Sequence, residues 1–147
     1  MDVKVEIARE ATAELVDAFG QLLPQLSSTA EPLDRVAVER LVSSATNTVL
    51  VARAEGMVVG TLTLVLFPVP SGLRGRVEDV VVDAAARGRG IAALLTNEAL
   101  RIAREAGART VDLTSRPDRT AANRLYERLG FRARESTVYR FALEPTR

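Results

Sequence analysis

Two spacings of apolar residues run through the 147-residue chain and predict both strands and helices. Alternating or continuous apolar runs are typical of strands, whereas apolar residues three and four positions apart are typical of helices. The first pattern predicts strands over residues 3–7, 48–54, 57–67, 77–83 and 109–114, with one or two more over Phe131–Leu143. The second predicts helices over residues 12–26, 34–43, 91–106 and about 120–129.

Local signals at the ends of these segments indicate how they connect. Thr12 and Asp34 have the short polar side chains that cap helix N-termini, and Thr120 or Asp118 is expected to cap the last helix. The Glu55-Gly56 pair between two predicted strands indicates a tight turn, and therefore an antiparallel hairpin. Pro68–Gly75 is rich in proline, glycine and serine and is predicted to form a loop. Because hairpins and helical crossovers both occur, we expect a mixed sheet with helices on its faces.

Chain length and element order together predict the fold class. A chain of 147 residues is about the size of one ordinary domain. The run Val80-Val81-Val82 is apolar on both faces of its strand, which favours a central place in the sheet. We therefore predict a single domain over residues 1–147 with an α/β fold (α+β mixed sheet). Its central mixed sheet is expected to have six to seven strands, flanked by about four helices.

Composition narrows the chemistry that the chain can perform. It contains no cysteine, no histidine and no tryptophan. This excludes disulfide scaffolds, thiol nucleophiles, Ser-His-Asp catalysis and zinc sites built from Cys and His. Acid–base chemistry must come from Asp, Glu, Tyr, Lys, Arg, the backbone or water. No metal site is expected.

Charge and hydropathy favour a soluble protein without a nucleic-acid or membrane partner. The formal net charge is +1, so no global field attracts anionic polymers or lipids. No segment approaches the roughly 20 apolar residues of a membrane span. The start, MDVKVEIARE, lacks the basic-then-apolar pattern of a secretory signal. A cytoplasmic location is therefore expected.

A glycine-rich turn stands between the predicted central strand and the most regular helix. Its sequence is Arg87-Gly88-Arg89-Gly90-Ile91-Ala92. The first N–H groups of a helix have no partner within it, and the helix dipole favours an anion there. Glycines allow a phosphate to approach the backbone, and Arg87 and Arg89 add charge-assisted donors. The other interpretation is a connection that needs positive φ angles and carries two solvated arginines.

Two common phosphate motifs fit this turn poorly. A P-loop needs a lysine, and Lys4 is the only lysine of the chain. The run Gly88–Ala93 fits the dinucleotide fingerprint G-x-G-x-x-A, with Asp112 about twenty residues further on. However, Asp83–Arg87 separates the strand from the first glycine, and Asp112 lies inside a predicted strand. Dinucleotide binding therefore remains an alternative with a weak match.

Two motifs in register resemble the GNAT superfamily of N-acetyltransferases. Arg87–Ala92 matches the signature [Q/R]-x-x-G-x-[G/A] that follows a central strand in that family. Asn123-Arg124-Leu125-Tyr126, followed by Gly130-Phe131, is similar to the family's second motif. The element order also agrees with the family fold, so the resemblance covers nearly the whole chain.

The resemblance implies that acetyl-CoA is bound as a co-substrate. Backbone N–H groups of Arg89 to Ala92 would cradle its pyrophosphate beside Arg87, and the edge of Val80–Val82 would pair with the pantetheine arm. Tyr126 occupies the position of the family's general acid, although its spacing also fits a core tyrosine. The residues assigned to the co-substrate are Val80, Val81, Val82, Arg87, Gly88, Arg89, Gly90, Ile91, Ala92 and Asn123.

The catalytic base is predicted from position in the central strand. Glu78 and Asp79 begin this strand and are the best placed carboxylates. Strand alternation puts Glu78 on the face of Val80 and Val82, and Asp79 on the opposite face. We favour Glu78 acting through water; the other interpretation is a carboxylate paired with Arg74 or Arg76.

The resulting function is transfer of an acetyl group from acetyl-CoA to a primary amine, by direct attack through a tetrahedral intermediate. A non-catalytic acetyl-CoA sensor or interaction module on the same fold is the alternative. Arg74–Val82 also resembles the central strand of glucosamine-6-phosphate N-acetyltransferases, but Asp112–Arg119 departs from their pattern. Small-molecule and peptide amines both stay open as acceptors. The resemblance to this family also implies a homodimer.

Overall fold

The computed structural model of the chain describes residues 2–144. These residues form two compact units. The first covers residues 2–114 and contains the sheet, three α-helices and a short 3-10 helix. The second covers residues 115–144 and contains the last helix.

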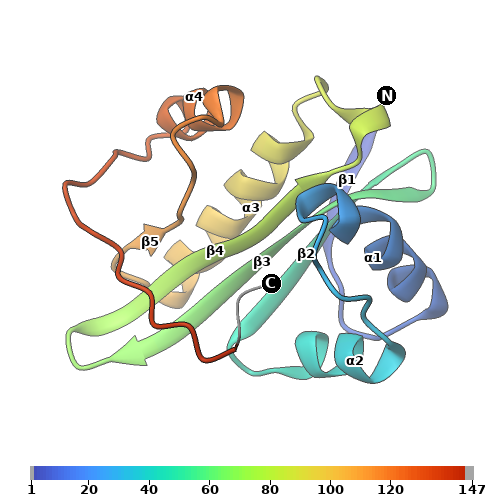
Figure 1. Cartoon of the computed structure of the whole chain (residues 1–147), viewed down its shortest axis with the longest axis horizontal. Coiled ribbons are helices and arrows are strands. Elements are labelled where there is room, and N and C mark those ends of the chain that lie inside the picture. The colour runs from blue at the N-terminus through green and yellow to red at the C-terminus, as the bar shows by residue number, and fades with distance from the viewer. Residues whose placement is uncertain (1, 145–147) are drawn as a thin grey trace. The chain divides into compact units, whose positions relative to one another are not determined.

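The sheet of the first unit has five strands in sequence order (Figure 1). The first four pair antiparallel with their neighbours, whereas the last pairing is parallel. The predicted mixed sheet is therefore confirmed, but with five strands instead of six to seven. The strands are β1 (Val3–Ile7), β2 (Asn47–Ala54), β3 (Met57–Val69), β4 (Gly72–Val82) and β5 (Val111–Asp112).

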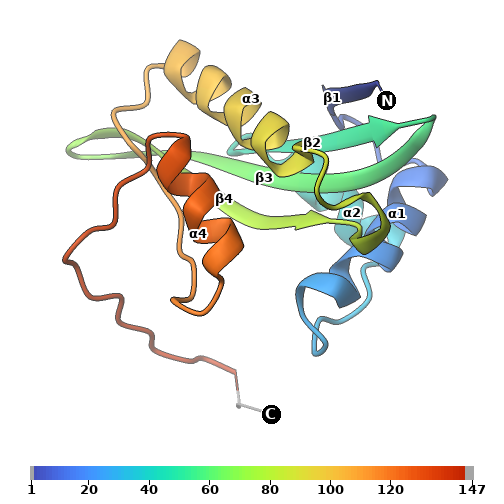
Figure 2. The ribbon, with the colours of Figure 1, turned by 90° about the horizontal axis from the view of Figure 1, so that it is seen from above.

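Helices cover both faces of this sheet. Figure 2 shows α3 on one face and α1 and α2 on the other. The predicted caps form: Thr12 Oγ1 accepts from Leu15 N at 3.1 Å, and Asp34 Oδ1 accepts from Ala37 N at 2.8 Å. The helices of this unit are α1 (Ala13–Leu26), α2 (Arg35–Ser43), the short η1 (Ala84–Ala86) and α3 (Ile91–Ala106).

Strand alternation divides the core into two clusters, one on each face. Toward α3, even-numbered residues of β2 and β3 such as Leu50 and Leu62 pack with Ile91 and Leu95. On the other face, odd-numbered Val49 and Val51 pack with α1 and α2. Both clusters belong to residues 2–114, so this unit holds the buried core that positions the glycine turn.

Gly60 allows α3 to approach the sheet closely. A Cβ at this position would lie 3.3 Å from Leu95 Cδ1, 3.3 Å from the carbonyl oxygen of Val81 and 3.4 Å from Ile91 Cγ2. Its φ angle is not in the left-handed region, so the constraint is space. The missing side chain sets the height of the α3 N-terminus above β3 and β4.

The two hairpins differ in how well the sequence predicts them. The turn after β2 forms at Glu55 and Gly56, whose φ angles of 51° and 79° match the left-handed turn expected there. The loop predicted over Pro68–Gly75 is wrong, because β3 continues to Val69 and β4 already begins at Gly72. Backbone pairing between two long strands therefore overrides the loop-like composition of this segment.

The second unit is built around α4 (Thr120–Arg128). The helix ends with a Schellman motif, in which Phe131 N donates to the carbonyl of Tyr126 at 3.0 Å and Gly130 N to that of Glu127 at 3.1 Å. Gly130 has a φ angle of 105°, which this ending requires. Arg119, not the predicted Thr120 or Asp118, is the residue before the helix, and no side chain caps it.

The strands predicted over Phe131–Leu143 are wrong for the described residues. Residues 131–144 form neither helix nor strand. Their apolar side chains alternate as in a strand, yet no pairing with another strand is present within residues 2–144. Alternation marks a segment that can pair, but a strand forms only where a partner backbone accepts it. The apolar residues left exposed are Val138, Tyr139, Phe141 and Leu143.

Candidate functional site

A bulge in β4 sets the directions of the candidate carboxylates. Glu78 pairs with Thr63 and Val81 with Thr61, so three steps along β4 match two steps along β3. Asp79 lies at this irregularity with a φ angle of 51°. Because the extra residue shifts the alternation, Glu78 lies on the same face as Val81. The prediction that Glu78 shares a face with Val80 and Val82 is therefore wrong.

Beyond the bulge, the β5-facing edge of β4 has no strand partner within residues 2–144. The parallel ladder between β4 and β5 contains only the pairs Gly75–Val111 and Arg76–Asp112. Val80–Val82 lies past this ladder, while its opposite edge still pairs with β3. Such an edge presents backbone donors and acceptors in the pattern that an added amide chain can use.

The glycine turn adopts the conformation that its two glycines allow. Gly88 and Gly90 have φ angles of 80° and 77°, in the left-handed region. A Cβ built at either position meets no atom within 4 Å, so crowding does not explain the glycines. The turn therefore combines a backbone shape that favours glycine with open space above it.

The N-terminus of α3 points into this turn without a side-chain cap. Gly90 is the capping residue, and the first turn of the helix holds no acidic side chain. Ile91 is 2% exposed and anchors the first turn in the core. Arg87 Nε donates to the carbonyl oxygen of Val82 at 3.2 Å, and the side chains of Arg87 and Arg89 are exposed. The helix dipole and two cations thus meet at one exposed turn.

Two glutamines of α1 hold the segment that leads into the turn, a contact that the sequence analysis missed. Gln21 Nε2 donates to Asp83 Oδ2 at 3.0 Å, and Ala84 N donates to Gln25 Oε1 at 2.8 Å. Asp83 also caps η1 through Ala85 N at 2.9 Å. The available signal was that Gln21 and Gln25 are the chain's only glutamines and lie one helical turn apart.

Glu78 is half exposed and lies beside an arginine. Its Oε1 atom is 3.4 Å from Arg76 Nε, and 49% of its side chain is accessible. This is the ion pair that the alternative interpretation anticipates. Asp79 is also exposed, at the bulge. Both carboxylates are thus accessible on β4, and the choice of Glu78 as base stays a prediction.

Tyr126 lies in the second unit, on α4. Its ring packs edge-on against Phe131 with 5.8 Å between centroids, which supplies the apolar contact of the Schellman motif. Partial burial raises the pKa of the Tyr126 phenol above its ordinary value of 10.0, and the nearby Arg119 cation acts in the opposite direction. The phenol is therefore a protonated group at neutral pH, while its ring has a structural role.

Asn123 holds the loop before α4. Its Nδ2 atom donates to the carbonyl oxygen of Arg116 at 3.0 Å, and its backbone N donates to that of Arg119 at 2.9 Å. The residue is half buried, so it is more than a plain exposed helix position. Its predicted contact with the co-substrate stays a prediction.

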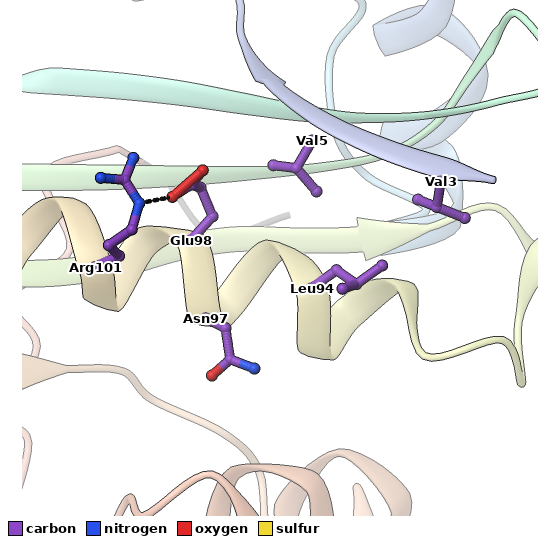
Figure 3. Close-up of a pocket in the computed structure, with 6 residues that line it drawn as sticks. All are labelled: Val3, Val5, Leu94, Asn97, Glu98 and Arg101. Atoms are coloured by element: carbon purple, nitrogen blue, oxygen red, sulfur yellow. Dashed lines mark hydrogen bonds and ion pairs between the residues drawn. The ribbon is translucent and has the colours of Figure 1, made fainter.

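A separate hollow of about 370 Å³ lies between β1 and α3 (Figure 3). Val3, Val5 and Leu94 form its apolar part, while Arg101 is held by ion pairs with Glu98 and Glu105. None of its lining residues belongs to the glycine turn or to β4. Its charges are already paired with one another, so we do not assign the reaction to it.

Two further observations concern residues 2–144 as a whole. Among residues 2–144, every helix is too short or too polar to cross a membrane. In the same residues, no group of three or more Asp or Glu side chains is arranged to hold a metal ion.

Part of the chain is similar to curated proteins. The chain is 47% identical over 60 residues to a rice (Oryza sativa subsp. japonica) protein described as a probable glucosamine 6-phosphate N-acetyltransferase, over 41% of this chain and 34% of that protein. The chain spans between a third and a half of the curated relatives that it matches.

Two solved structures resemble nearly the whole chain. A Trypanosoma brucei acetyltransferase is 28% identical, with a TM-score of 0.79 over 96% of this chain and all of that one. A Bacillus halodurans C-125 transcriptional regulator is 27% identical, with a TM-score of 0.80 over the same shares. The model of the acetyltransferase (GNAT) family matches residues 12–131. With two motifs in register, the shared fold and a match over most of its length, the chain belongs to the acetyltransferase (GNAT) family.

Proposed function

We propose that this chain transfers the acetyl group of acetyl-CoA to a primary amine. The observation that carries this proposal is the uncapped N-terminus of α3 behind Gly88 and Gly90, with open space above both. A diphosphate fits such a turn, because backbone N–H groups and the helix dipole both favour an anion there. Because the chain belongs to an acetyltransferase family, we infer that this diphosphate is the one in coenzyme A.

Different residues of the first unit bind different parts of acetyl-CoA. Backbone N–H groups from Arg89 to Ala92 bind the diphosphate, with Arg87 beside it. The unpaired edge of Val80–Val82 hydrogen-bonds the amides of the pantetheine arm, as an added strand would. A backbone N–H at the same edge stabilises the negative charge that develops on the thioester oxygen.

The reaction is a direct displacement at the thioester carbon. The neutral amine attacks this carbon, a C–N bond forms, and the C–S bond breaks as the tetrahedral intermediate collapses. One amine proton passes through water to Glu78, and the CoA sulfur receives a proton from Tyr126. Because the chain has no cysteine, no thiol is present to form an acetyl-enzyme, which favours the direct route.

The test is an acetylation assay with the full chain. Acetyl-CoA is incubated with a panel of small-molecule, amino-sugar and peptide amines, and release of free CoA thiol is followed together with the mass of the acetylated product. We expect thiol release that depends on both the protein and an amine. The proposal fails if no amine in the panel is acetylated.

A non-catalytic acetyl-CoA-binding module is the second candidate. It is favoured by the similarity to a transcriptional regulator over nearly the whole chain. This candidate predicts binding of acetyl-CoA without product in the same assay. Dinucleotide binding, the weaker alternative, predicts stabilisation by NAD instead of acetyl-CoA.

A further inference from the structure

Two arginines follow one another along the face of β4 that carries Glu78. Phe67 pairs with Arg74, Val65 with Arg76 and Thr63 with Glu78, without irregularity. Thr63 in turn pairs with Val49, which packs toward α1 and α2. The side chains of Arg74, Arg76 and Glu78 therefore lie in one row on the face opposite α3.

Hydroxyl groups orient these guanidinium groups without neutralising them. Arg74 Nη1 donates to Thr110 Oγ1 at 3.0 Å and its Nη2 to Ser71 Oγ at 2.9 Å. Arg76 Nη2 donates to Thr114 Oγ1 at 2.7 Å, while its Nε atom lies beside Glu78. Within residues 2–144, Arg74 has no carboxylate in ion-pair range.

Arginines with a plain structural role look different in this chain. Arg53 pairs with Glu6 at 3.0 Å and with Glu14 at 2.8 Å. Arg101 likewise pairs with two glutamates of its own helix. A guanidinium that neutral hydroxyls hold in place keeps its charge available, and its planar fork suits a phosphate or carboxylate. Arg74 has this second arrangement.

The two arginines lie on the side of Glu78 that faces away from the proposed acetyl-CoA edge. Glu78 lies two residues from Arg76 and four from Arg74, or roughly 7 and 13 Å along a strand. The bulge and the open edge of Val80–Val82 follow directly after Glu78. The Glu78 carboxylate already lies 3.4 Å from Arg76 Nε, which leaves Arg74 as the main anchor for an anion.

We propose that the acceptor is a primary amine that carries an anionic group, a phosphate or a carboxylate, bound chiefly by Arg74, with Arg76 beside it, while its nitrogen lies at Glu78. This inference rests on the proposed acetyl transfer, since that function places the amine at Glu78. It adds the chemical class of the acceptor. A small amine with a phosphate and a short peptide with an acidic second residue both satisfy it.

The test compares matched acceptors that differ only in the anion. One pair is glucosamine 6-phosphate and glucosamine; the other is a tripeptide with an acidic second residue and its amide counterpart. We expect the charged member of at least one pair to have a kcat/KM about tenfold or more higher, the effect of a hydrogen bond to a charged group. The pair that shows the preference identifies the source of the anion.

Variants connect this preference to the arginine. Arg74→Gln should remove the discrimination within the pair through KM, and Arg74→Lys should keep part of it. Arg104→Gln, an exposed arginine of α3 on the opposite face, is the matched control and should keep all of it. Equal use of charged and neutral acceptors, or a preference that survives Arg74→Gln, overturns the inference.

A calorimetric titration separates this inference from the function on which it rests. The charged and neutral members of each pair are titrated into the protein in the presence of CoA, which requires no turnover. Stronger binding of a charged member that Arg74→Gln abolishes supports the inference even if the assay detects no acetylation. Absence of such binding overturns it, whereas acetylation of neutral amines alone still leaves the proposed function standing.

Discussion

Single residues decide the shape of the glycine turn. Gly88→Ala and Gly90→Ala each force a side chain into the left-handed region, which costs about 1 kcal/mol. The new methyl also enters the space where the diphosphate is proposed to lie. We predict weaker acetyl-CoA binding by calorimetry for both variants.

The matched control for these variants is Gly20→Ala. Gly20 is an exposed residue inside α1, with nothing within 4 Å of an added Cβ. Alanine in a helix interior stabilises by about 1 kcal/mol relative to glycine, so this variant should unfold at higher temperature and bind acetyl-CoA normally. If Gly88→Ala and Gly90→Ala bind as tightly as Gly20→Ala, the turn does not hold the diphosphate.

The phenol of Tyr126 gives a second prediction. Tyr126→Phe keeps the ring that packs against Phe131 but removes the proton donor. We predict a fall in kcat of roughly 100-fold, the low end for general acids, because a thiolate is a good leaving group. The Kd of acetyl-CoA should stay within error, and an unchanged kcat would leave Tyr126 with its structural role alone.

The same phenol predicts a pH dependence of stability. Its folded-state pKa lies above the unfolded value of about 10, so the folded state holds this proton more tightly. The stabilisation is present below pH 10 and is lost as the pH rises through the folded-state pKa. Urea unfolding should therefore show the wild type losing stability relative to Tyr126→Phe above pH 10, and parallel profiles would contradict this.

Residue-scale sequence reasoning succeeded where chemistry is local and failed where geometry depends on a neighbour. Thr12 and Asp34 cap their helices as predicted, because capping needs only a short polar side chain and the next turn. The face of Glu78 was wrong because the bulge at Asp79 shifts the alternation. No feature of the β4 sequence alone marks that bulge.

At the scale of elements, α1 supports the segment before the glycine turn. Gln25→Leu removes the acceptor for Ala84 N, a hydrogen bond worth about 1 kcal/mol. We predict that the KM for acetyl-CoA rises several-fold with kcat little changed. Gln25→Glu keeps an acceptor oxygen and should restore the KM, so equal behaviour of the two variants would contradict a positioning role.

The close packing of α3 against the sheet at Gly60 gives another prediction. Gly60→Ala places a Cβ about as close as neighbours tolerate, and Gly60→Val adds two methyl groups at the same place. Overpacking of this kind costs about 1–3 kcal/mol, so stability should fall in the order Gly, Ala, Val. Urea unfolding measures the series, and three equal midpoints would contradict the close approach.

Element prediction was most accurate where periodicity is strong. Helix α3 forms over the predicted residues 91–106, with apolar positions on one stripe. The strand predicted over 109–114 shortens to Val111–Asp112, and β4 gains the residues from Gly72 that composition had assigned to a loop. Strand limits depend on the partner strand, which periodicity within one segment does not describe.

At the scale of the whole molecule, the α/β class and the mixed sheet were predicted, and the number of strands was not. Two separated motifs identified the family, because their order and spacing constrain the chain more than either motif alone. The alternating segment over Phe131–Leu143 has the pattern of a strand but no partner within the described residues. Whether such a segment pairs depends on a partner strand, which its own sequence does not describe.

The central claim is that this chain binds acetyl-CoA at the glycine turn and transfers its acetyl group to an amine. The most direct measurement is thermal unfolding of the full chain titrated with acetyl-CoA, with NAD at equal concentrations as the comparison. We predict a saturable rise in Tm, corresponding to about 2.7 kcal/mol at a hundredfold excess over Kd, and no rise with NAD. A Tm that does not respond to acetyl-CoA or CoA at any concentration would contradict the claim.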